Sequence, residues 1–169
     1  MSVGSGTLWV SYHQFWLLSD GADTLPLAEP DPLSFVELRP DAAMVRTGLS
    51  MGTIAVTVAQ LDRPPAAIDS SSQWEDVVEF SFTEEAVSPI LVVALEADPE
   101  PGIPDVSIDD SEEPLRVRVH GIGRDCDTTD EPAQPTEAYP IQVWQAPPAA
   151  AETLRANSTR AGTGIWVAP

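Results

Sequence analysis

The sequence predicts an all-β protein, an antiparallel two-sheet β-sandwich of about six to eight strands with at most one short C-terminal helix. Three observations predict it. Short runs rich in Val, Ile, Trp, Phe and Tyr recur along the chain, 17 prolines interrupt it, and no segment of helical length repeats its apolar residues about every 3.6 positions. Runs bounded by Pro, Gly, Asp and Ser are typical of strands and turns. Because helices are missing, parallel βαβ units are excluded.

The expected strands differ in how clearly their residues alternate. The first, residues 8–18, is partly apolar on both faces, which is typical of a strand covered on both sides. The clearest alternation lies in residues 52–61, where Ile54, Val56 and Val58 share one face. A period of two residues excludes a helix there. Further strands are expected at residues 43–47, 74–82, 90–95, 115–120 (with its arginines on the outer face) and 139–144, and the short helix at 148–157.

The length of 169 residues fits one compact core. We expect the β-sandwich domain to span residues 1–146 and a Pro/Ala-rich C-terminal extension to follow at 147–169. No apolar run approaches the roughly 18 residues that a membrane span needs. The first residues also carry no basic segment of the kind that opens a secretory signal. The expected location is therefore the cytoplasm.

Charge is the most unusual property of the sequence. There are 27 acidic residues against 8 basic ones, all of them Arg, and the formal net charge is −19. Residues 62–137 hold 20 acids and 4 arginines, a net of −16, whereas residues 1–61 carry −4 and residues 138–169 carry +1. Such a field repels phosphate backbones and anionic membranes, which argues against direct binding of nucleic acid or lipid surfaces. It favours a basic protein partner, or it serves only solubility.

Two acidic connections separate the expected strands. The first acidic connection, residues 96–114, holds eight acids, four prolines and no base, and the second spans residues 121–138. Loops of this kind usually carry the function of a sandwich. Neither connection has the spacing of an EF-hand, so we expect solvated carboxylates rather than a Ca²⁺ site. The predicted partner-binding residues are Asp105, Asp109, Asp110, Glu112, Glu113, Asp125, Asp127, Asp130 and Glu131.

Catalytic chemistry has no support in the sequence. The two histidines, His13 and His120, fall in separate expected strands, and Cys126 lies beside carboxylates that disfavour a reactive thiolate. No glycine-rich phosphate loop is present. We therefore expect no cofactor, no metal and no enzymatic activity.

Five tryptophans offer a different reading, a sugar-binding platform. Four of them lie in or beside expected strands, and burial in the core is the commoner fate of such residues. We expect core positions for Trp9, Trp16, Trp74 and Trp144.

An ordered series of segments, residues 11–15, 74–79, 115–121 and 137–144, resembles small acidic β-sandwich proteins that are common in actinobacteria, some of them encoded near secreted toxins. The series is also similar, more distantly, to the competence protein J nuclease-inhibitor family. The likeness covers residues 7–145. It implies an inhibitor or immunity protein that binds a basic nuclease or a similar toxin.

The negative charge of the sequence is of the sign that this hypothesis requires. A nuclease needs a cationic cleft for phosphates, and a carboxylate-rich loop can occupy that cleft as a polyanion mimic. The alternative is a protein-interaction or structural module that uses a sheet face or edge. Its affinity would depend weakly on salt and would rest on exposed apolar residues such as Trp9 or Trp166. A carbohydrate-binding module is the third hypothesis.

Overall fold

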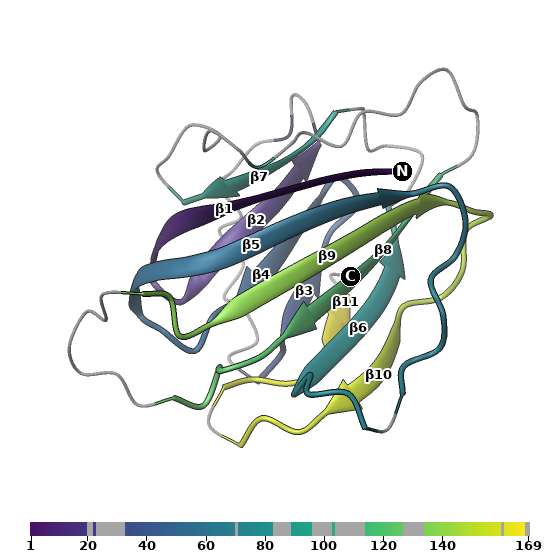
Figure 1. The fold of residues 1–169 in the computed structure, drawn as a ribbon. Helices are drawn as coiled ribbons and strands as arrows, with labels where there is room; N and C mark the ends of the chain where they lie inside the picture. The colour runs from purple at the N-terminus through teal and green to yellow at the C-terminus, as the bar shows by residue number, and fades with distance from the viewer. Residues whose placement is uncertain are drawn as a thin grey trace.

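The computed structural model describes residues 1–19, 22, 33–69, 71–82, 89–95, 103, 114–126, 134–159 and 161–167. Within these ranges the chain forms eleven strands and no helix (Figure 1), so none of the described residues belongs to a helix that could cross a membrane. The strands are β1 (Ser2–Ser11), β2 (Gln14–Ser19), β3 (Val36–Leu38), β4 (Ala42–Arg46), β5 (Met51–Leu61), β6 (Asp76–Ser81), β7 (Ile90–Ala94), β8 (Leu115–Gly121), β9 (Ala138–Gln145), β10 (Glu152–Ala156) and β11 (Ile165–Val167).

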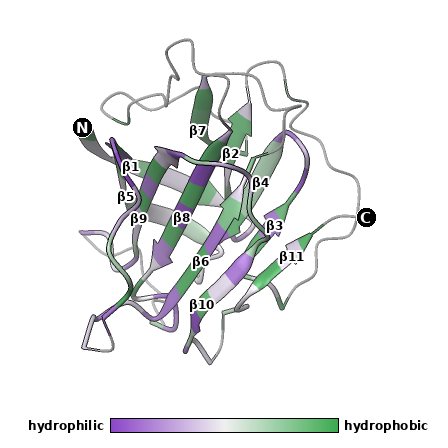
Figure 2. Ribbon diagram, turned by 90° about the vertical axis from the view of Figure 1, so that its right-hand side faces the viewer, coloured by the Kyte–Doolittle hydropathy of each residue, from purple (hydrophilic) through white to green (hydrophobic). Residues whose placement is uncertain are grey.

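All the strands belong to one sheet. Its order is β10-β6-β8-β9-β5-β1-β2-β4-β3-β11, and β7 pairs with β2 beside this path. The sheet turns sharply between β1 and β2, which share a single pair, Ser11 with Gln14. It wraps round until its two end strands, β10 and β11, approach each other, giving a nearly closed, barrel-shaped sheet (Figures 1 and 2). The predicted two-sheet sandwich of six to eight strands is therefore wrong.

The sheet is mixed rather than antiparallel. β5 pairs with β9 in parallel, from Ala55 with Ala138 to Leu61 with Trp144, and β11 pairs with β3 in parallel. Parallel neighbours need a long crossover. Here β6, β7 and β8 lie in the crossover between β5 and β9, so strands take the place of the helix that a βαβ unit would use.

Alternating side chains fill the interior. Ile54, Val56 and Val58 of β5 are buried, as their spacing predicts, and they join a single large cluster of apolar residues. A second, smaller cluster lies on the other face of β2, β4 and β7, around Trp16 and Met44. These strands are therefore covered on both faces, and Figure 2 shows β7 green along most of its length.

Two predicted elements differ in the structure. The expected helix at 148–157 contains β10 instead, which pairs antiparallel with β6. A helix of some ten residues is marginal by itself, whereas the open edge of β6 offers backbone hydrogen bonds. The expected strand at 8–18 is divided by a two-residue turn, Tyr12 and His13. β10 and β11 both lie in the predicted C-terminal extension, and both pair within the common sheet.

Candidate functional site

Asp125 is the one predicted partner-binding residue that the described part of the chain includes. Its Oδ2 accepts hydrogen bonds from the backbone nitrogen and hydroxyl of Thr159, at 2.6 and 2.8 Å, and its Oδ1 accepts one from the Ala161 nitrogen at 3.1 Å. The carboxylate thus fastens the segment between β10 and β11. The other predicted residues lie outside the described residues: Asp105, Asp109, Asp110, Glu112, Glu113, Asp127, Asp130 and Glu131.

The second acidic connection is fixed at both of its ends. Ile122 and Ala138 exchange backbone hydrogen bonds of 3.1 and 3.2 Å. Gly123 has a φ of +79°, and a Cβ there would lie 2.1 Å from the carbonyl oxygen of Thr136. Only glycine permits the segment at Gly123 to come this close to the segment at Thr136. The acidic residues between them therefore start and finish at one defined place on the barrel.

Glu137 ties this connection to the turn between β4 and β5. Its buried carboxylate accepts hydrogen bonds from the Gly48 and Leu49 nitrogens, at 3.0 and 2.5 Å, and from the Tyr139 hydroxyl. Burial raises the pKa of the Glu137 carboxyl, and these hydrogen bonds oppose the rise. Burial likewise raises the pKa of Tyr139 well above its usual value, so the phenol keeps its proton and donates a hydrogen bond to Glu137.

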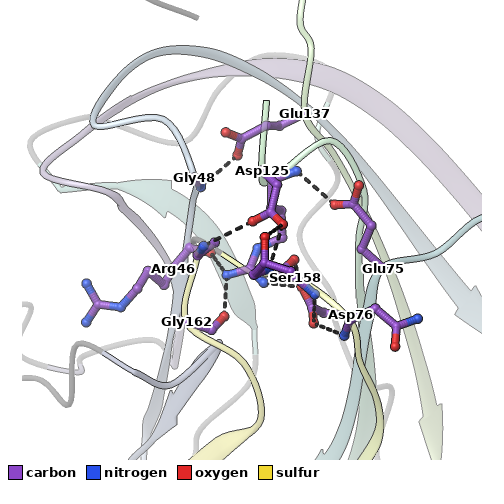
Figure 3. A network of polar contacts seen from close by, with 12 residues as sticks. Arg46, Gly48, Glu75, Asp76, Asp125, Glu137, Ser158 and Gly162 are labelled. Carbon is purple, nitrogen blue, oxygen red and sulfur yellow. Dashed lines mark hydrogen bonds and ion pairs between the residues drawn. The ribbon is translucent and has the colours of Figure 1, made fainter. Parts of the chain in front are cut away.

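Arg124 lies where β6 comes near the segment before β11, and Figure 3 shows its partners Arg46, Asp76 and Gly162 close together. The side chain is fully buried, pairs with Asp76, and donates to the carbonyl oxygens of Arg46 and Gly162 at 3.0 and 2.8 Å. Its guanidinium carbon lies 4.0 Å from the centroid of the Phe35 ring. Asp76 in turn accepts hydrogen bonds from the Ser158 hydroxyl and the Asn157 nitrogen. One cation thereby joins β6, β4 and the segment before β11.

A second buried ion pair lies on the outer side of β6 and β8. Glu79 accepts from Nε of Arg116 at 2.9 Å and from Nε of Arg118 at 2.8 Å. Arg116 also donates to the carbonyl oxygens of Ala149 and Ala150, and Arg118 to that of Ala66. The arginines alternate with valines along β8 (Figure 2) and lie on its outer face, as predicted. The segments before β6 and β10 cover them there, so they are buried.

The burial of these arginines changes the charge balance of the surface. Residues 62–137 hold four arginines, and three of them, Arg116, Arg118 and Arg124, are buried in ion pairs. Arg63 is exposed. These buried cations are held by Glu79 and Asp76, so they are not available to pair with other carboxylates. The surface of this region is therefore short of positive charge.

A cleft of about 510 Å³ lies beside the start of β1 and the end of β9. It holds one carboxylate, Asp62, which pairs with the N-terminal ammonium at 2.9 Å. Among the residues the structure describes, no group of three or more His, Cys, Asp or Glu side chains is placed to bind a metal ion. The cleft is lined by Met1, Ser2, Gln60, Leu61, Asp62, Leu115, Trp144 and Gln145.

The tryptophans divide between core and surface. Trp16 and Trp144 are buried, as expected. Trp74 is partly buried and packs on the His120 ring, at 5.2 Å between centroids. Trp9 is 44% exposed, so the expected core position is wrong there. Its β1 neighbours Leu8 and Val10 take the core-facing positions instead.

His120 makes the stability of the fold depend on pH. Burial, helped by the charge of Arg118, lowers the pKa of this histidine below 6.5, although a hydrogen bond to the Pro140 carbonyl opposes the shift. The unfolded chain therefore binds the proton more readily, and the free energy of unfolding falls as the pH drops through about 6.5. We expect His120→Gln to lose less stability than the natural protein between about pH 7.5 and 5.5, by urea unfolding. Equal slopes for both proteins would contradict this.

Comparison with known proteins gives a likeness of fold. No protein-family model matches the chain, and no curated protein matches it in sequence. Two solved structures resemble this chain in fold at low sequence identity.

One of these is ComJ from Bacillus subtilis, an inhibitor of the DNA-degrading activity of NucA, seen in its crystal structure. It aligns with 86% of this chain and 100% of its own, with a TM-score of 0.51 and 12% identity. A second, described as crocagin biosynthetic gene J, has a TM-score of 0.46 and 13% identity over 85% of this chain and 97% of its own. The likeness to ComJ supports, at the level of fold, the distant similarity to the competence protein J family.

Proposed function

We propose that this protein is a non-enzymatic acidic binding protein, an inhibitor or immunity protein that neutralises a basic nuclease-like toxin. The observation that carries the proposal is the burial of Arg116, Arg118 and Arg124 inside the most acidic part of the chain. Residues 62–137 have a net charge of −16, and their internal arginines are held by buried acids. The remaining carboxylates can act together on a basic partner.

The likeness of fold to ComJ supports the same proposal. ComJ inhibits a DNA-degrading protein, and it shares with this chain a fold that extends over the whole of ComJ. A nuclease has a cationic cleft for the phosphates of its substrate, and a protein surface rich in carboxylates can bind there in place of that substrate. Electrostatic steering accelerates such association by about 10-fold to 1,000-fold.

The surface we assign to the partner consists of the two acidic connections. The second connection is held on the barrel by the contacts of Gly123, Asp125 and Glu137. In the first, Ile103 is buried and packs against Gly6 of β1. The partner-binding carboxylates are those predicted from the sequence, from Asp105 to Glu131.

The test is capture of the partner on the immobilised protein at low salt, with a lysate of the source organism, followed by elution in a salt gradient. We expect one basic protein, released at a few hundred millimolar salt because the Debye length shortens. The eluted protein should degrade DNA, and the degradation should stop when this protein is added back. A captured protein without nuclease activity overturns the inhibitor assignment. An apolar partner that salt does not release would instead fit the interaction module.

Neutralising the first acidic connection is expected to slow association. The variant with Asp109→Asn, Asp110→Asn, Glu112→Gln and Glu113→Gln should bind the captured partner about 10-fold more slowly at low salt. Its urea midpoint should not change. The matched control is Glu152→Gln, an exposed acid of β10, which should keep the natural association rate. An association rate of the quadruple variant equal to that of the control would exclude these four residues from the interface.

A further inference from the structure

The turn between β1 and β2 has an unusual backbone for its sequence. Ser11 and Gln14 pair directly, so the turn consists of Tyr12 and His13 alone, with φ angles of +55° and +60°. A two-residue hairpin with positive φ at both positions is the geometry that Asn-Gly and similar pairs favour. Bulky side chains adopt it rarely. The two residues therefore hold a conformation that costs free energy, which calls for a compensating role.

His13 has such a role within the fold. Its backbone nitrogen donates to the Ser50 carbonyl at 3.2 Å, and its own carbonyl accepts from the Thr47 nitrogen at 2.9 Å. The ring nitrogen Nδ1 lies 3.1 Å from the Gly48 carbonyl oxygen, which requires a proton on Nδ1. His13 thus fixes the hairpin to the turn between β4 and β5.

Tyr12 has no comparable internal contact. Its side chain is 71% exposed, and it makes no hydrogen bond, ion pair or ring contact with any of the described residues. The backbone that carries the ring is nevertheless anchored, because His13 is bonded to the turn between β4 and β5. An exposed aromatic side chain that the fold does not use is available to a partner, and its binding orders only the two χ angles of the side chain.

Two further exposed residues lie beside Tyr12. Trp9 is 44% exposed and Met51 is 62% exposed. In the register of β1 and β5, Trp9 pairs with Thr53 and Ser11 pairs with Met51, so Trp9 and Met51 are diagonal neighbours on the outer face. Tyr, Trp and Met are enriched at protein interfaces, and Tyr and Trp dominate the residues that carry binding energy.

We propose that Trp9, Tyr12 and Met51, here called the hairpin tip, form the apolar anchor for the partner, a folded basic protein with an apolar pocket rimmed by Lys or Arg. This rests on the proposed function. We choose a basic partner because its charge is complementary to that of the second acidic connection, which is tied to the same turn as the hairpin. Glu137 joins the second acidic connection to Gly48 and Leu49, and His13 joins the hairpin to the same turn. Figure 1 shows the hairpin, this turn and the start of β9 together at the left-hand end of the barrel.

The hairpin tip and the acidic connection act on different steps of binding, dissociation and association. The uncharged anchor is buried only in the final complex, so its loss raises the dissociation rate. The carboxylates of the acidic connections are charged, so they act over a longer range and set the association rate. The two sets of variants should therefore change different rate constants.

The deciding variant is Tyr12→Asn. Asn is the non-glycine residue best suited to positive φ, so the fold should keep or raise its urea midpoint. Against the captured basic partner we expect a dissociation rate at least about 10-fold faster and an association rate within about threefold of the natural value. The matched control is Val3→Asn, at the far end of the same outer face of β1 and also exposed. Its dissociation rate should stay within about twofold.

The outcomes separate this proposal from the proposed function. Equal dissociation rates for Tyr12→Asn and the natural protein overturn the hairpin tip and leave the inhibitor assignment intact. A basic partner that lacks nuclease activity overturns the inhibitor assignment, while the dissociation rates still decide the tip. A natural protein that sediments as a dimer, with Tyr12→Asn as a monomer, would show that a second copy occupies the tip and would overturn the basic partner. Capture of no basic protein at low salt overturns both.

Discussion

Arg124→Met is expected to lower the free energy of unfolding by about 3 to 5 kcal/mol. The substitution removes a cation that is fully buried and leaves the carboxylate of Asp76 in the barrel without its counter-charge. It also removes the donors to the carbonyl oxygens of Arg46 and Gly162, which lie on the β4 and β11 side of the seam, whereas Asp76 lies in β6 on the β10 side. Methionine fills much of the volume, so the loss reports polar contacts rather than a cavity.

Urea unfolding followed by far-UV circular dichroism measures this effect. Arg63→Met is the matched control, because Arg63 is exposed and the same substitution there should change stability by less than about 0.5 kcal/mol. Ser158→Ala removes one hydrogen bond to Asp76 and should cost about 1 kcal/mol, which gives a measurable value if Arg124→Met does not fold. A loss below about 1 kcal/mol for Arg124→Met would show that the end strands hold together without this cation.

The strands that were predicted correctly have one property in common. In β5, β6 and β8, apolar residues alternate with polar ones, and the alternation survives because one face of each strand packs on the core. Ile54, Val56 and Val58 are the clearest case. Local pattern decides the structure wherever burial on one face is the dominant contribution to stability.

The errors arise where contacts distant in sequence decide the structure. Residues 8–18 show no Gly, Asn or Asp that would indicate a turn, yet the chain reverses at Tyr12 and His13 because His13 is held by residues 47–50. β10 forms because β6 presents an open edge. The closure into one sheet depends on Arg124 and Asp76, which are separated by 48 positions and carry no signal of pairing in the sequence.

The sequence shows where acids cluster but not how the ends of the acidic connections are held. Acid clustering is a property of composition, so the sequence shows it directly. The contact of Glu137 with Gly48 and Leu49 depends on the parallel pairing of β5 with β9, which the expected antiparallel topology lacked. The contact of Asp125 with Thr159 and Ala161 depends on the position of the segment between β10 and β11, where a helix was expected just before it. The exposure of Tyr12 follows from the position of a turn that has no local signature, and the exposure of Trp9 follows from Leu8 and Val10 facing the core.

Glu79→Gln is expected to have an effect of similar size, because it leaves two buried arginines without an anion. The side chains of Arg116 and Arg118 are 6% and 9% exposed, and Glu79 is their common partner. An amide offers one neutral acceptor where the carboxylate offered two charged ones. We expect a loss of about 3 kcal/mol or more in the free energy of unfolding. The two arginines would still be desolvated on folding, but the attraction of the carboxylate would no longer offset that penalty.

The control for Glu79→Gln lies directly across the strand pair. Glu152 of β10 pairs with Glu79 in the register but is exposed, so Glu152→Gln should leave stability within about 0.5 kcal/mol of the natural value. A near-neutral Glu79→Gln would mean that Arg116 and Arg118 can turn outward into solvent at little cost. They would then be able to offset the carboxylates of the acidic connections, and the charge argument for a basic partner would lose its structural basis. A large loss would mean that those two positive charges stay buried beside Glu79, so that the carboxylates of the acidic connections remain free to meet a cationic surface.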